Sequence, residues 1–171
     1  MLYHISEEPG IIEFIPRKPE FELWKNLPPV VWAIDDEHLF YYYFPRDCPR
    51  IIYHFSEDIH EDDKIKYFSN TTSKIIITIE NRWFKKMTDT TIYKYIFGEQ
   101  DFTLLDNTPG NYISEKTIKP KGIEKINNLI DLLLGLDIEL RLTPNIFPLR
   151  NSLIKSTIKK FSIIRFRNAI Q

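Results

Sequence analysis

An imidazole lies near the start of the chain, where His4 is flanked by apolar residues in the segment 2–5. This segment is apolar on both faces, and the pair Pro9-Gly10 that follows it predicts a turn. We therefore expect a short strand within a sheet core. A histidine on such a strand is either a hydrogen-bonded core group or a site residue, and both interpretations stay open.

Residue spacing disfavours three common kinds of chemistry. The four histidines and the one cysteine show no spacing typical of a helical metal pair or a zinc knuckle, so we expect no metal site. Cys48 would need a lowered thiol pKa to act as a nucleophile; Arg46 and Arg50 would lower that pKa, whereas Asp47 would raise it, and we expect a structural cysteine. The five glycines include no phosphate-binding loop, which leaves nucleotide triphosphate hydrolysis and hydride transfer without their usual support.

A scattered set of polar and aromatic side chains remains, and it comes from separate parts of the chain. The set consists of His4 on the first predicted strand, Arg17 after it, Trp32 on the second strand, Arg46 and Arg50 in a proline-bounded loop, and Tyr112 and Glu115 on a late strand.

Strands predominate among the elements that must position these residues. Runs of apolar and β-branched residues predict core strands at 2–5, 30–34, 50–55, 74–79 and 111–118. The last of these follows a predicted turn, Asn107-Thr108-Pro109-Gly110.

Helices are predicted from caps and from the spacing of apolar residues. The pair Asp35-Asp36 offers an N-cap for a helix over residues 37–43, which ends before Pro45. Apolar residues three and four apart predict the clearest helix from Ile123 to Leu134, and a further helix is predicted over residues 149–159. We therefore expect an α+β fold with short helices and a mixed, largely antiparallel sheet.

Length and composition indicate one globular domain over residues 1–171. Hydrophobic residues make up 43% of the 171 positions, which suffices for one ordinary core. The first twenty residues show no export signal, and no apolar run approaches the length of a membrane span, so we expect no membrane association. A single cysteine allows no intramolecular disulfide, and the expected location is the cytoplasm.

The charge of −1 is unevenly distributed along the chain. Residues 140–171 contain seven basic residues and no acidic one, so the rest of the chain carries −8. Such asymmetry is typical of a surface that faces nucleic acid or phosphate, and also of a tail that packs on an acidic body. The basic residues are Arg141, Arg150, Lys155, Lys159, Lys160, Arg165 and Arg167.

Six segments together resemble an uncharacterised bacterial family, a domain of unknown function. They are Leu-Tyr-His-Ile-Ser-Glu-Glu-Pro at 2–9, Pro-Arg at 16–17, Val-Val-Trp-Ala-Ile-Asp at 30–35, Pro-Arg-Asp-Cys-Pro-Arg at 45–50, Glu-Leu-Arg at 139–141, and Phe-Ser-Ile-Ile-Arg-Phe-Arg-Asn-Ala at 161–169. The resemblance spans nearly the whole chain, and it implies no activity.

Three positions carry a weaker resemblance to the ADP-ribosyltransferase superfamily. Leu2-Tyr3-His4 resembles the first-strand motif of the small bacterial enzymes that modify rifamycins and of the tRNA phosphotransferases that share their fold. Trp32 stands where those proteins have tyrosine, serine or threonine, and Glu115 is the nearest match to their late acidic residue. The resemblance implies a split sheet.

The same resemblance implies that NAD is cleaved at the bond between nicotinamide and ribose. That cleavage develops oxocarbenium character, which a carboxylate such as Glu115 would stabilise. The other groups implied are His4 for the ribose hydroxyls, Trp32 or Tyr112 for stacking on nicotinamide, and Arg17, Arg46 or Arg50 for the pyrophosphate. The acceptor is not implied, and we expect His4 and Glu115 to line one pocket.

A second hypothesis comes from a different class of protein, a non-catalytic domain that binds nucleic acid or a protein partner. It rests on the basic segment 140–171, in which Phe161 and Phe166 are interleaved with the seven basic residues. Aromatic and basic side chains together suit base stacking and phosphate contact, although they also suit a buried terminal strand.

Overall fold

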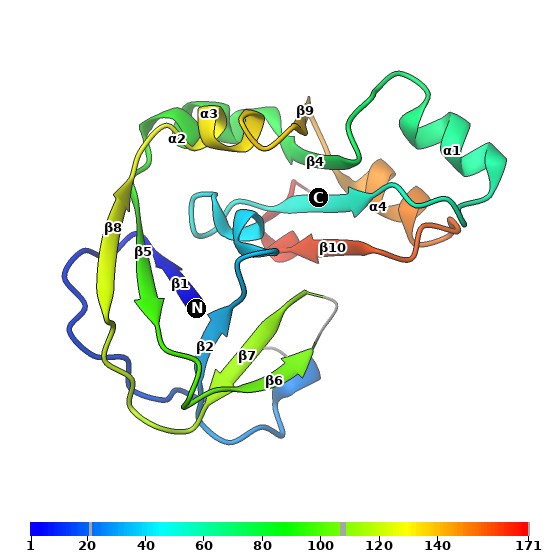
Figure 1. Cartoon of the computed structure of the whole chain (residues 1–171). Coiled ribbons are helices and arrows are strands. Elements are labelled where there is room, and N and C mark those ends of the chain that lie inside the picture. The colour runs from blue at the N-terminus through cyan, green and yellow to red at the C-terminus, as the bar shows by residue number, and fades with distance from the viewer. Residues whose placement is uncertain (21, 107–108, 171) are drawn as a thin grey trace. The chain divides into compact units, whose positions relative to one another are not determined.

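The computed structural model describes residues 1–20, 22–106 and 109–170, and the chain forms two compact units (Figure 1). The first unit comprises residues 1–43 and 91–127, and the second comprises residues 44–90 and 128–170. Each unit is therefore assembled from two separate segments of the chain. In the predicted turn, Asn107 and Thr108 lie outside the described residues, and Gly110 has the positive φ of 65° that favours glycine.

The first unit is built on a sheet of six strands in the order β6-β7-β2-β1-β5-β8. All the paired strands of this sheet run antiparallel. The elements are β1 (Leu2–Ser6), β2 (Val31–Ile34), β5 (Ile92–Phe97), β6 (Thr103–Asp106), β7 (Asn111–Ser114) and β8 (Gly122–Ile126), with 3-10 turns η1 (Glu22–Trp24) and η2 (Leu39–Tyr42).

One face of this sheet carries an aromatic core. Leu2, Val31 and the fully buried Tyr95 and Phe97 pack together there. The ring of Phe14 meets those of Tyr95 and Phe97 edge to face, with centroids 5.0 Å away in both pairs. The core therefore holds the segment after β1 against the sheet.

The second unit is built on a sheet of four strands in the order β10-β3-β4-β9. Its β4 and β9 run parallel, and the other two pairs are antiparallel. The elements are β3 (Arg50–His54), β4 (Ile75–Glu80), β9 (Ile138–Thr143), β10 (Phe161–Ile164), the helices α1 (Glu61–Phe68), α2 (Phe84–Asp89), α3 (Leu129–Leu134) and α4 (Phe147–Leu153), and the 3-10 turns η3 (Asn81–Trp83) and η4 (Phe166–Asn168).

The central strand β4 of this sheet is buried on both faces. Ile76 joins a core cluster with Phe68 of α1 and Leu153 of α4. Ile77 and Ile79 project from the opposite face and are fully buried as well. The β-branched run that predicts a deep strand at 74–79 is therefore confirmed as β4.

The predicted α+β class is confirmed, with mostly antiparallel strand pairs and short helices. That the whole chain forms one domain stays a prediction. In the described part of the chain, no helix has the length and apolar character needed to cross a membrane.

The helix predicted from Ile123 to Leu134 is wrong in its first half. Residues 122–126 form the strand β8, and only Leu129–Leu134 are helical. Ile123 pairs with Tyr95 and Ile126 with Ile92 at the edge of the sheet. Backbone pairing with β5 therefore decides the conformation of a segment whose apolar spacing also fits a helix.

Other predicted bounds change for local reasons. The helix expected over 37–43 is only the 3-10 turn η2, whose N-cap is His38 and has no side-chain cap hydrogen bond. The side chain of Asp35 instead accepts from the backbone N–H of His38 at 2.9 Å. The helix predicted over 149–159 is α4, which begins earlier and ends at Leu153. The late strand ends at Ser114, and Ile118 pairs instead with Phe14.

Candidate functional site

The sheet of the first unit separates between β1 and β2. Tyr3 pairs with Ile34, but just before β2 begins the backbone of Val30 is bonded to Arg17, with both N···O distances at 3.0 Å. Between these two pairs, the carbonyl of Trp32 accepts a hydrogen bond from Nδ1 of His4 at 3.0 Å. A side chain thus takes the place that a neighbouring strand would fill.

The imidazole of His4 is held in one orientation. A carbonyl oxygen can only accept, so Nδ1 carries the hydrogen and Nε2 of the neutral ring is an acceptor. The ring packs against Phe14 with centroids 4.9 Å apart. On the neighbouring strand, the hydroxyl of Tyr95 donates to the carbonyl of Glu8 at 2.7 Å and accepts from the N–H of Ile11 at 3.0 Å, which fixes the loop after β1.

Register places Tyr112 on the same face of the sheet as His4. Tyr3, Ile34 and Asn111 are aligned through two strand pairs, so they project from one face. His4 and Tyr112 each follow one of these residues and therefore project from the other. The ring of Tyr112 packs against the aromatic core of that face.

The indole of Trp32 lies on the opposite face, where it meets Trp24 with ring centroids 6.3 Å apart. This face also carries Tyr3, whose pKa is raised by burial, and Lys94, whose Nζ lies 5.3 Å from the centre of the Tyr3 ring. Lys94 forms an ion pair of 2.7 Å with Glu124. Trp32 therefore contacts His4 through its carbonyl, while its side chain belongs to a different surface.

Arg17 and Glu115 flank the same end of β2. The backbone of Arg17 is hydrogen-bonded to that of Val30, and Arg17 is exposed. Ser114, the last residue of β7, pairs with Val31, and Glu115 follows it directly. Glu115 is also exposed.

Arg46 and Arg50 belong to the second unit, and Arg50 has a structural role there. Arg50 is only 3% exposed. Its Nη1 donates to the carbonyl of Cys48 at 2.8 Å, and its guanidinium lies 4.9 Å from the centre of the Phe44 ring. Arg46 is exposed. Burial raises the pKa of Cys48 to about 12 although Arg50 opposes the shift, so this thiol is no nucleophile near neutral pH.

Several basic residues of segment 140–171 have acidic or polar partners. Nε of Arg141 forms an ion pair of 2.5 Å with Glu139, and Nζ of Lys159 forms one of 2.7 Å with Asp58. Nη1 of Arg150 donates to the side chain of Asn151 at 3.1 Å. Phosphate groups of a nucleic acid would have to compete with these contacts for the basic side chains. Binding of nucleic acid through this segment stays a prediction.

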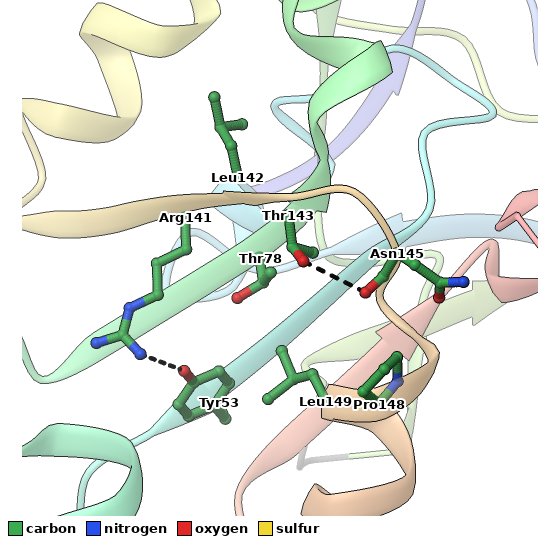
Figure 2. A pocket seen from close by; sticks show the side chains of 8 residues that line it. All are labelled: Tyr53, Thr78, Arg141, Leu142, Thr143, Asn145, Pro148 and Leu149. Atoms are coloured by element: carbon green, nitrogen blue, oxygen red, sulfur yellow. Dashed lines mark hydrogen bonds between the residues drawn. The ribbon is translucent and has the colours of Figure 1, made fainter.

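Two arrangements were missed by sequence reasoning. Asp35 accepts from Nδ1 of His38 at 2.8 Å, while the buried Nε2 of that ring has no hydrogen-bond partner among the described residues. The spacing of three residues between Asp35 and His38 was an available signal. The second is a hollow in the second unit, bordered by Tyr53 and Arg141 (Figure 2); it depends on strand pairing that local sequence does not encode.

A family model described as "Family of unknown function (DUF6886)" matches residues 3–169. A search of curated proteins finds no match. A search of solved structures finds none either.

Proposed function

We propose that this chain, which belongs to the family of unknown function DUF6886, binds NAD where β1 and β2 separate and transfers its ADP-ribose group to an acceptor. One observation carries the proposal. The imidazole of His4 bridges the separated strands through Nδ1 and is held against Phe14. We assign the Nε2 acceptor of this oriented ring to a hydroxyl group of a ribose.

Other side chains of the first unit would supply the remaining groups that this chemistry needs. The guanidinium of Arg17 suits the pyrophosphate, because it can donate in fork geometry. Tyr112 shares the face of His4 and is the aromatic residue that we assign to nicotinamide, whereas Trp32 contributes its carbonyl. Arg46 and Arg50 lie in the second unit and are not assigned.

The proposed reaction breaks the bond between the nicotinamide nitrogen and C1′ of the ribose. Nicotinamide leaves with the bonding electron pair and becomes neutral, while positive charge develops on the ribose. The carboxylate of Glu115 would stabilise that charge and accept the proton that the acceptor nucleophile loses as it bonds to C1′.

The test measures NAD binding by calorimetry and nicotinamide release by chromatography with the full chain. We expect His4→Ala to weaken binding and Glu115→Gln to leave binding intact while removing release. The matched controls are His60→Asn, which keeps an N-cap residue on α1, and Glu57→Gln at an exposed loop position.

Equal behaviour of all four variants and the wild type would refute these assignments. Failure of the wild type to bind NAD at millimolar concentration would end the proposal itself, because NAD binding does not depend on the identity of the acceptor.

A further inference from the structure

A hollow of about 260 Å³ lies on the face of the second sheet that carries Tyr53, Thr78 and Arg141 (Figure 2). Thr78 of β4 and Arg141 of β9 are direct neighbours in the parallel pair, and Tyr53 projects from β3 beside them. The loop from β9 to α4 and the first turns of α4 close the other side with Asn145 and Leu149. The hollow is thus framed by regular elements of one unit.

The hydroxyl of Thr78 is the unexplained group in this hollow. The residue is 4% exposed, and its Oγ1 forms no hydrogen bond of ordinary length with a described residue, although it lies close enough to the Tyr53 hydroxyl to oppose the rise that burial causes in the pKa of that group. Figure 2 shows this oxygen directed toward the space that Arg141 and Tyr53 border. A buried hydroxyl without a partner destabilises the folded state unless a ligand or water bonds to it.

Two of the other polar groups around Thr78 offer hydrogen-bond donors, whereas the Thr143 hydroxyl donates to the backbone carbonyl of Asn145. The Tyr53 oxygen accepts from Nη1 of Arg141 at 3.2 Å, so its own O–H can donate elsewhere. Oδ1 of Asn145 accepts from the N–H of Phe147 at 2.8 Å, which leaves the amide NH₂ of Asn145 as a donor. No carboxylate is among the described lining residues, since Glu139 pairs with Arg141 without bordering the hollow.

We propose that this hollow binds a small organic monocarboxylate. The carboxylate oxygens would accept from the hydroxyls of Thr78 and Tyr53, and the carboxylate charge would face the guanidinium of Arg141. The charge of Arg141 is shared with Glu139, and the described residues that line the hollow include no second cation, so one negative charge fits better than the two of phosphate.

The apolar part of the lining limits the rest of the ligand. Leu142, Pro148 and Leu149 border the hollow and would contact a short hydrocarbon body. The volume of about 260 Å³ is below the range of typical drug-sized pockets, which suits a molecule of a few carbon atoms. This inference concerns the second unit and does not rest on NAD binding by the first.

The experiment uses butyrate as the probe and compares the wild type with Thr78→Val. Valine has the shape of threonine without the hydroxyl, so removing the unpartnered group should raise the midpoint of thermal unfolding without ligand. Butyrate binding, followed by NMR titration, should weaken about tenfold, because one hydrogen bond to a charged group is lost. Thr72→Val, at an exposed loop position of the same unit, should change neither measurement.

Three results would overturn the proposal. Equal butyrate affinity of the wild type and Thr78→Val would remove the hydroxyl from the site. A lowered unfolding midpoint for Thr78→Val would show that the hydroxyl is already bonded within the protein. Binding of butyramide or inorganic phosphate as tightly as butyrate would exclude a monocarboxylate as the ligand class.

Discussion

Substitution of His4 separates its structural role from its proposed binding role. His4→Ala removes the donor to the Trp32 carbonyl and the packing on Phe14. An unsatisfied buried carbonyl costs about 1–3 kcal/mol, and a lost aromatic contact costs about 0.5–1.5 kcal/mol. Because His4 is only half-buried, we expect the lower part of the combined range, about 2 kcal/mol of unfolding free energy.

His4→Asn tests which nitrogen matters. The amide nitrogen of asparagine lies at a similar distance from the backbone as Nδ1 of histidine, so it can donate to the Trp32 carbonyl, but it has no group that replaces Nε2. We therefore expect this variant to recover about half of the lost stability and to bind NAD as weakly as His4→Ala.

Equilibrium unfolding in urea measures both effects. With a slope of about 1–3 kcal/mol per molar for a small protein, a loss of about 2 kcal/mol moves the midpoint by about 1 M. An unchanged midpoint for His4→Ala would refute the bridging role of the imidazole. Full NAD affinity in His4→Asn would refute the role of Nε2 and leave His4 as a core residue.

Three further outcomes are expected elsewhere in the chain. Gly110→Ala should destabilise the fold by about 2 kcal/mol or more in the same urea assay, because φ is positive there and a Cβ would clash with Asp35, and a wild-type midpoint would contradict this. Arg82→Ala should lower the free energy of unfolding by about 2–3 kcal/mol, because it leaves the fully buried carboxylate of Glu80 without its 2.9 Å ion pair. Glu80→Gln removes the buried charge itself and should lower the free energy of unfolding less, so the reverse order would contradict this reasoning. The buried thiol of Cys48 should resist Ellman's reagent at pH 8 until the chain unfolds, and rapid labelling of the native protein would contradict its buried position. Because the pKa of this thiol is raised in the folded state, the free energy of unfolding should fall as pH rises from about 9 toward 12.

The strands were predictable where composition and burial agree. β4 contains four isoleucines and is buried on both faces, so its residues indicate a strand in any context. Gly122–Ile126 was not predictable, because Ile123 and Ile126 are spaced as in a helix and only pairing with β5 makes them a strand. Here the long-range partner decides between two local conformations.

The position of His4 on the first strand was predictable, but its partner was not. The bond to the Trp32 carbonyl requires that β1 and β2 pair at Tyr3 and separate beyond it, which no local pattern encodes. The same holds for Thr78 and Arg141, which are 63 positions apart in the chain and become neighbours only through a parallel pair. Motifs therefore locate candidate side chains, while register decides which of them meet.

The division of each unit into two segments has a consequence for synthesis on the ribosome. β1 and β2 emerge early, but β5, which pairs with β1 along its whole length, follows only after residues 44–90 have been made. At about 5–20 residues per second, β1 then waits several seconds for that partner. A chain truncated at any one position cannot contain the whole of one unit without part of the other. The first unit is complete only when translation reaches residue 127, and the second unit is completed later still.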